Sequence, residues 1–244
     1  CHYCDFHFST NQELISELSY ALAAELRLQK DYLGNELIST IYFGGGTPSL
    51  LSIKEFELIF NSIHSLFRVQ LNPEVTLEAN PDDLSAPKLN ALKQLGFNRL
   101  SIGIQSFDDA ILKFLNRAQD GQSGLKSIQL ARQHGFENIS LDLIYSIPGQ
   151  DQSAWLKNMQ LATGLSPEHV SAYALTIEEK TVFGRLRQKG KLREVDEESS
   201  ARQFEMLMDH LEGAGYEHYE ISNFCKPNCY SQHNRNYWQQ VNYL

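Results

Sequence analysis

Leucines recur at every fourth position near the start of the chain: Leu14, Leu18, Leu22 and Leu26. Residues four apart lie on one face of an α-helix. We therefore expect an amphipathic helix over residues 12–30 whose leucine face packs against a core.

Apolar runs typical of buried strands then alternate with segments of helical length. The expected strands cover residues 38–43, 74–79, 98–104, 138–145 and 168–175. The expected helices between them cover residues 53–67, 85–96, 108–115, 121–134 and 151–163. Strands that alternate with helices through short connections form parallel βαβ units, so the pattern predicts an α/β fold.

A glycine followed by an aromatic residue marks three junctions between a helix and a strand: Gly96–Phe97, Gly135–Phe136 and Gly215–Tyr216. Glycine fits the left-handed position that ends a helix. After residue 176 the pattern changes to a charged stretch, a helix near 196–213 and a polar, aromatic tail. We infer a partial α/β barrel over residues 1–176, and a segment over residues 177–244 that completes it and begins a C-terminal α+β extension.

The whole chain has 244 residues and a formal net charge of −9. Binding to nucleic acid requires a basic surface, and no cluster of lysine and arginine supplies one, so nucleic acid is not an expected partner. No apolar run approaches the roughly 20 residues that span a bilayer, and no signal segment opens the chain. We expect a cytoplasmic protein without a membrane span.

Four cysteines form two close pairs, Cys1 with Cys4 and Cys225 with Cys229. This arrangement differs from the disulfide framework of small secreted domains and favours metal or redox chemistry. Zinc, redox and iron–sulfur sites all use the C-x-x-C spacing of the first pair. The second pair is either incidental or joins the first in a zinc site. Because the chain starts at a cysteine and ends without a stop signal, we interpret it as a fragment.

Unusual polar residues lie in or at the ends of the predicted strands: Gly44–Thr47, Glu78, Gln105 and Asp142. The carboxyl ends of barrel strands carry the functional sites of such folds. Three successive glycines let a ligand approach the backbone closely, whereas a tight turn usually needs only one. A carboxylate in an apolar strand must be paired, so Glu78 either forms an ion pair, for example with Arg99, or contacts a ligand.

A histidine followed closely by tyrosine and tryptophan stands near the end of the chain, in the segment His233–Trp238. Such a histidine is either a haem ligand with aromatic neighbours or a packed side chain in an aromatic corner. On physical grounds alone the second interpretation is favoured.

These motifs, in this order, resemble the oxygen-independent coproporphyrinogen III oxidase family of radical S-adenosylmethionine (SAM) proteins across almost the whole chain. The resemblance implies a partial (β/α)6 barrel of the TIM type. It also implies that the first strand and the first cysteine of a C-x3-C-x2-C motif precede Cys1, and that most of a C-terminal domain follows Leu244.

The resemblance further implies a 4Fe–4S cluster held by Cys1 and Cys4, and SAM bound beside it. The implied SAM contacts are Tyr3, Gly45, Gly46, Thr47, Glu78, Gln105, Arg117 and Asp142. In this family an electron from the reduced cluster, supplied by a donor such as a flavodoxin or ferredoxin, cleaves SAM to methionine and a 5′-deoxyadenosyl radical.

Two hypotheses about the function follow from the resemblance. Oxidases of the family carry one more cysteine where this chain has Phe6, and the H-N-x-x-Y-W string of His233–Trp238 is typical of relatives that act as haem chaperones. We therefore prefer a protein that binds haem, with His233 as a contact, and delivers it to an acceptor protein. The alternative is an oxidase that decarboxylates the propionate side chains of a porphyrinogen.

Overall fold

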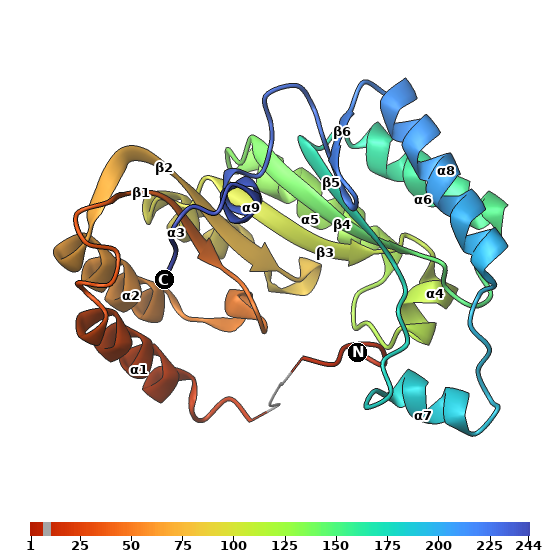
Figure 1. The fold of residues 1–244 in the computed structure, drawn as a ribbon, viewed down its shortest axis with the longest axis horizontal. Helices are drawn as coiled ribbons and strands as arrows, with labels where there is room; N and C mark the ends of the chain where they lie inside the picture. Colours follow the sequence, from red (N-terminus) through yellow and green to blue (C-terminus); the bar gives the residue numbers. More distant parts are fainter. Residues whose placement is uncertain (7–10) are drawn as a thin grey trace.

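A single curled sheet organises the molecule in a computed structural model that describes residues 1–6 and 11–244. Five parallel strands come first: β1 (Leu37–Phe43), β2 (Arg68–Ala79), β3 (Arg99–Gln105), β4 (Asn138–Tyr145) and β5 (His169–Ala174). The antiparallel strands β7 (Asn223–Cys225) and β6 (Glu217–Glu220) extend the sheet beyond β5. Figure 1 shows the resulting half-barrel, so the predicted α/β barrel class is confirmed.

The helices of the described residues follow the strands in the expected alternation. They are α1 (Ile15–Leu28), α2 (Ile53–Leu66), α3 (Ala86–Gln94), α4 (Asp109–Phe114), α5 (Gly121–Gln133), α6 (Gln152–Gly164), α7 (Val182–Gln188), α8 (Glu197–Gly213) and α9 (Gln232–Trp238). The strand predictions are confirmed to within one residue at each end, except that β2 begins at Arg68, before the expected residue 74. The sequence pattern did not predict α7 and α9.

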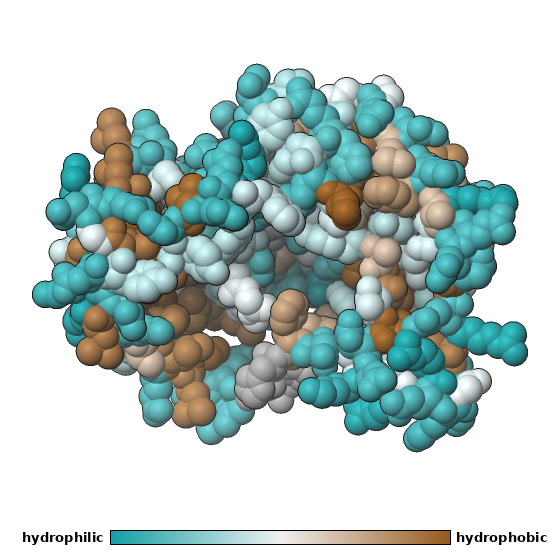
Figure 2. All heavy atoms as spheres, in the orientation of Figure 1, coloured by the Kyte–Doolittle hydropathy of each residue, from teal (hydrophilic) through white to brown (hydrophobic). Residues whose placement is uncertain are grey.

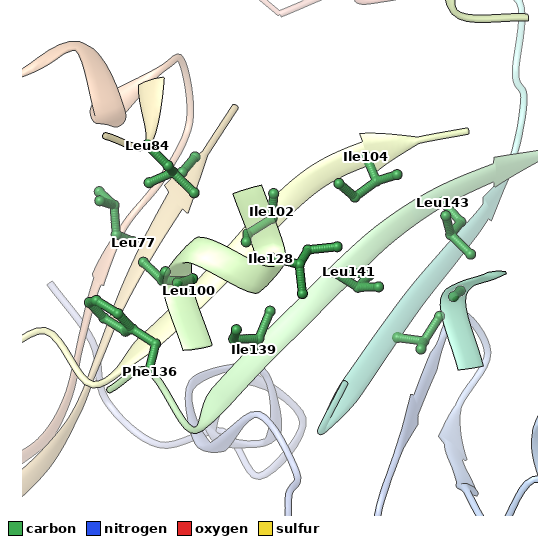
Figure 3. Close-up of a cluster of buried hydrophobic side chains, with 14 of the residues drawn as sticks. Leu77, Leu84, Leu100, Ile102, Ile104, Ile128, Phe136, Ile139, Leu141 and Leu143 are labelled. Atoms are coloured by element: carbon green, nitrogen blue, oxygen red, sulfur yellow. The ribbon is translucent and has the colours of Figure 1, made fainter. Parts of the chain in front are cut away.

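Alternation along each strand separates an apolar face from a polar face. One set of side chains, including Leu77, Leu100, Ile102 and Leu141, packs with Ile128 of α5 in the main core (Figure 3). The opposite, inner face carries mostly polar side chains. Figure 2 shows this side hollowed at its centre, with hydrophilic residues inside the hollow. We call this concave space the lumen.

Glycine ends three helices as predicted. Gly96, Gly135 and Gly215 have φ values of +100°, +80° and +85°, which is the left-handed conformation that ends a helix at low cost.

The prediction that the leucine face of the first helix packs against a core was wrong. Leu14 and Leu18 are 58% and 56% exposed, whereas Ser19 and Ala23 are buried. Helix α1 packs against α2 rather than the sheet, and its small residues allow the two backbones to come close. The apolar stripe therefore faces outward.

The segment after residue 176 continues the same sheet through the β6–β7 hairpin, and α9 then crosses to β1 at the far edge (Figure 1). Among the described residues no helix is both long and apolar enough to cross a membrane.

Candidate functional site

The glycine loop after β1 approaches a carboxylate from the neighbouring strand. A Cβ atom at Gly44 would lie 2.6 Å from Cε1 of Tyr42 and 2.8 Å from Oε1 of Glu78, so only glycine fits there. The next residue, Gly45, has a φ of +98° and donates its backbone N–H to Oε2 of Glu78 at 3.2 Å. The loop and the strand acid thus form one unit.

Glu78 also accepts a hydrogen bond from the hydroxyl of Tyr42 at 2.8 Å. Its two carboxylate oxygens therefore have different partners, one from a side chain and one from the loop backbone. Among the described residues no ion pair joins Glu78 to Arg99, so that interpretation of the acid was wrong. Hydrogen bonds to Tyr42 and Gly45 stabilise the carboxylate instead.

Arg117 connects three parts of the site. Its Nη2 donates to Oδ1 of Asn80 and to the carbonyl of Gly103, each at 2.8 Å, and its Nε donates to Gln119 at 3.2 Å. Its Nη1 lies 3.5 Å from the Sγ of Cys1. The guanidinium therefore holds the N-terminal cysteine segment beside the ends of β2 and β3.

Asp142 lies deeper in the lumen on β4. The hydroxyl of Ser101 on β3 donates to its carboxylate, at 3.1 Å from Oδ1. Burial and then repulsion by the carboxylate of Glu78 raise the pKa of Asp142 to about 7. At neutral pH the carboxyl of Asp142 is therefore protonated in a large part of the molecules.

Gln105 ends β3 with a φ of +65°, at a point where the register with β4 shifts. The side-chain nitrogen of Gln105 would lie 2.9 Å from a Cβ at Gly103. The absence of a side chain at Gly103 thus lets the Gln105 amide turn back toward Arg117 and the site.

The N-terminal segment docks against α4 and α7 through its backbone. The N–H of His2 donates to the carbonyl of Leu115, and the carbonyl of His2 accepts from the N–H of Phe183. Tyr3 packs against the second apolar cluster around Ile144 and Phe183, and burial raises its pKa. Cys1 is exposed, Cys4 is half-buried, and both are free thiols.

The residues present fit the implied cofactors. Cysteine thiolates are the usual ligands of iron–sulfur clusters, and Cys1 and Cys4 supply two of them. A Cβ at Gly45 or Gly46 would meet no atom within 4 Å, so the exposed loop Gly44–Thr47 borders open space. The carboxylate of Glu78, which contacts this loop, and the guanidinium of Arg117, which bonds to Asn80 two residues after Glu78, suit a ligand that carries both an amine and a carboxylate. Among the described residues no group of three or more metal-ligating side chains occurs.

His233 lies on the inner face beside β1 rather than with the cysteines. Its Nδ1 is 2.9 Å from Oγ1 of Thr40, and its Nε2 is 3.2 Å from the hydroxyl of Tyr237. The imidazole stacks on Tyr42 with the ring centres 4.7 Å apart. Burial and the charge of Arg99 lower its pKa. Both ring nitrogens therefore have partners, and the partner of Nε2 is the hydroxyl of Tyr237, a half-exposed residue.

Several residues of the site escaped the sequence reasoning. They are Asn80, Ser101 and Gly103, which position Arg117, Asp142 and Gln105. Their roles depend on how the strands align, which no single motif reveals, whereas Gly44, which leaves room for Glu78, belongs to the glycine run that the sequence pointed to. Cys225 is buried on β7, and among the described residues no group of three or more metal-ligating side chains joins it to Cys1 or Cys4.

The family model described as the Radical SAM superfamily matches residues 1–162. The chain is 40% identical over 246 residues to "Heme chaperone HemW" of Bacillus subtilis, and 34% identical over 245 residues to the mitochondrial "Radical S-adenosyl methionine domain-containing protein 1" of Mus musculus. Both alignments include 100% of this chain, but 65% and 55% of the relatives. The chain thus spans less than two thirds of their length.

Among solved structures, coproporphyrinogen III oxidase (HemN) from Escherichia coli is similar with a TM-score of 0.83. The match covers 99% of this chain and 55% of that protein, at 22% sequence identity. At this identity the likeness shows a shared fold and does not extend to the activity.

Proposed function

Because this chain belongs to the radical SAM superfamily, we propose that it binds a 4Fe–4S cluster and SAM and acts as a haem chaperone. The observation that carries the haem part is the 40% identity over the whole chain to a protein named as a heme chaperone. Since the chain spans less than two thirds of that relative, haem binding and delivery to an acceptor protein are both parts of the proposal.

In this proposal Cys1 and Cys4 hold the cluster, and Arg117 positions the segment that carries them. Glu78 and Asp142 bind the amine of SAM, while Tyr3, Gln105 and Arg117 complete the contacts. The loop residues Gly45, Gly46 and Thr47 offer backbone groups to the methionine end of SAM. When bound, the reduced cluster supplies the electron for SAM cleavage.

Two features of the sequence support the chaperone over the oxidase. Phe6, where the oxidases have a cysteine, is 74% exposed and offers no ligand. His233 and its aromatic neighbours form the second feature. The proposal includes cytoplasmic location and an electron donor such as a flavodoxin or ferredoxin.

The proposal predicts that the intact protein, reconstituted anaerobically with iron and sulfide, develops a Soret band on titration with haem. His233→Ala removes the proposed contact with haem. It should therefore weaken haem binding about 10-fold or more, which corresponds to a loss of at least ~1.4 kcal/mol of binding free energy. His134→Ala is the matched control, because His134 is a half-buried histidine outside the proposed site whose ring bonds to Asn90 at 2.7 Å.

Unchanged haem affinity in His233→Ala would remove that residue from the site. The same reconstituted protein, supplied with SAM and coproporphyrinogen III under reducing conditions, should give no decarboxylated product. Product formation would favour the oxidase instead.

A further inference from the structure

Three polar side chains lie side by side across the inner face of the sheet. Thr76 of β2 is the register partner of Arg99 on β3, which in turn is the register partner of Asn138 on β4. The neighbouring Leu77, Leu100 and Ile139 point into the apolar core on the other face, so all three polar side chains face the lumen. We call them the lumen row.

Each member of the lumen row has a buried polar atom with no hydrogen-bond partner in the described part of the chain. These atoms are Oγ1 of Thr76, Nε of Arg99 and Oδ1 of Asn138. They make up half of the six such atoms found there. Buried polar groups are normally hydrogen-bonded, so this concentration in one row indicates that a polar ligand or ordered water binds there.

Arg99 is the strongest indication. It is only 2% exposed, its Nε has no hydrogen-bond partner, and among the described residues no carboxylate forms an ion pair with it within 4.0 Å. A buried charge without a partner is costly. A guanidinium presents five donors in a planar fork that matches a carboxylate.

Three acids of β2 and β4 already accept hydrogen bonds from other groups. Glu74 accepts hydrogen bonds from the backbone N–H groups of Gln232 and His233. Glu78 accepts from Tyr42 and Gly45, as described above, and Asp142 accepts from Ser101. The charge of Arg99 acts on the carboxylate of Asp142, but none of these three acids forms an ion pair with it, so its donors remain available to a group that enters the lumen.

The lumen row also lies next to His233, the residue proposed to contact haem. Tyr42 of β1 is the register partner of Thr76, and the ring of Tyr42 stacks on His233. The charge of Arg99 is close enough to act on the His233 ring. The lumen row and His233 are thus neighbours, joined through Tyr42.

We propose that the lumen row binds a carboxylate of the ligand, with Arg99 as the charged partner and Thr76 and Asn138 as neutral ones. This inference rests on the proposed function, which makes the carboxylate a propionate of haem. Thr76 donates its hydroxyl, and Asn138 contributes its amide NH2 once the amide turns over.

The test compares haem with haem dimethyl ester, in which both propionates are blocked, on the intact protein by Soret titration. The unmodified protein should bind haem about 10-fold or more tightly than the ester, as expected for a charged hydrogen bond worth about 1.5–3 kcal/mol. Arg99→Gln should remove this preference, and Thr76→Val should reduce it. Ser171→Ala is the control, because it removes a lumen hydroxyl that already bonds to Asn223.

Equal losses for haem and ester in both variants would mean that the lumen row supports the fold only, and would overturn the inference. An unchanged preference for haem would overturn it as well. If Arg99→Gln fails to fold, Thr76→Val decides, since it removes only an atom without a partner. Absence of haem binding by the unmodified protein would instead refute the proposed function, and this inference with it.

Discussion

At the scale of single residues, the two strand acids Glu78 and Asp142 each accept hydrogen bonds from a neighbouring strand or loop. Glu78 and Asp142 stood out as acids within apolar strands, and the structure gives each a hydrogen-bonded setting. Ser101, which donates to Asp142, looks like any strand serine in the sequence. Its role follows only from the register of β3 against β4, because partners 41 residues apart are joined by topology.

Asp142 makes stability depend on pH in an unusual direction. Its pKa is about 7 in the folded protein against 3.8 in its ordinary state, so between about pH 4 and 7 the folded chain holds a proton that the unfolded chain has lost. The free energy of unfolding should therefore fall as pH rises through this range. Asp142→Asn should remove the slope and stabilise the ligand-free protein at pH 8 by about 1–3 kcal/mol.

Urea denaturation at pH 5, 6, 7 and 8 measures this effect. Asp209→Asn is the control, because Asp209 is an exposed acid on α8, and its pH profile should match that of the unmodified protein. A profile for Asp142→Asn parallel to that of the unmodified protein would contradict the assignment.

At the scale of elements, periodicity identified most helices and strands but failed to orient α1. A leucine every fourth residue shows which face is apolar, and it does not show whether another element covers that face. The close approach of α1 to α2 depends instead on the small residues Ser19 and Ala23, both buried. The short α7 and α9 escaped prediction because seven residues hold too few turns for a periodic signal.

The packing of α1 predicts a contrast between two adjacent alanines. Ala23→Leu places a large side chain into the contact with α2 and should destabilise the protein by about 1–3 kcal/mol. Ala24→Leu, at an exposed position of the same helix, should change stability by less than about 0.5 kcal/mol. Thermal denaturation of both variants provides the measurement, and equal effects would show that the small-residue face is not the packed one.

At the scale of the whole molecule, the sequence predicted the parallel half-barrel but not where the C-terminal segments lie against it. Nothing local in residues 215–244 reveals that β7 pairs with β5 or that α9 lies against β1. The contacts that decide this are made across the chain, such as Glu74 with the backbone of Gln232, 158 residues away. Local patterns therefore define the strands, and long-range hydrogen bonds define where the last segments lie.

Glu74 should act as the anchor of α9. Its buried carboxylate accepts the N–H groups of Gln232 and His233, and charge-assisted bonds of this kind contribute about 1.5–3 kcal/mol. Glu74→Ala should speed hydrogen exchange of the backbone amides in α9 by about 10-fold or more. Glu36→Ala is the control, since Glu36 is exposed and its carboxylate accepts from the Asn242 side chain, outside α9, and it should leave exchange in α9 unchanged.

The position of α9 has a consequence for how the chain folds. Thr40 and His233, which meet in the finished structure, are 193 residues apart. At a synthesis rate of about 5–20 residues per second, roughly 10–40 s pass between the synthesis of β1 and the synthesis of α9, which covers its inner face. During that interval the hydrophilic side chains of the lumen are an advantage, because a polar surface left open is far less prone to aggregate than an apolar one.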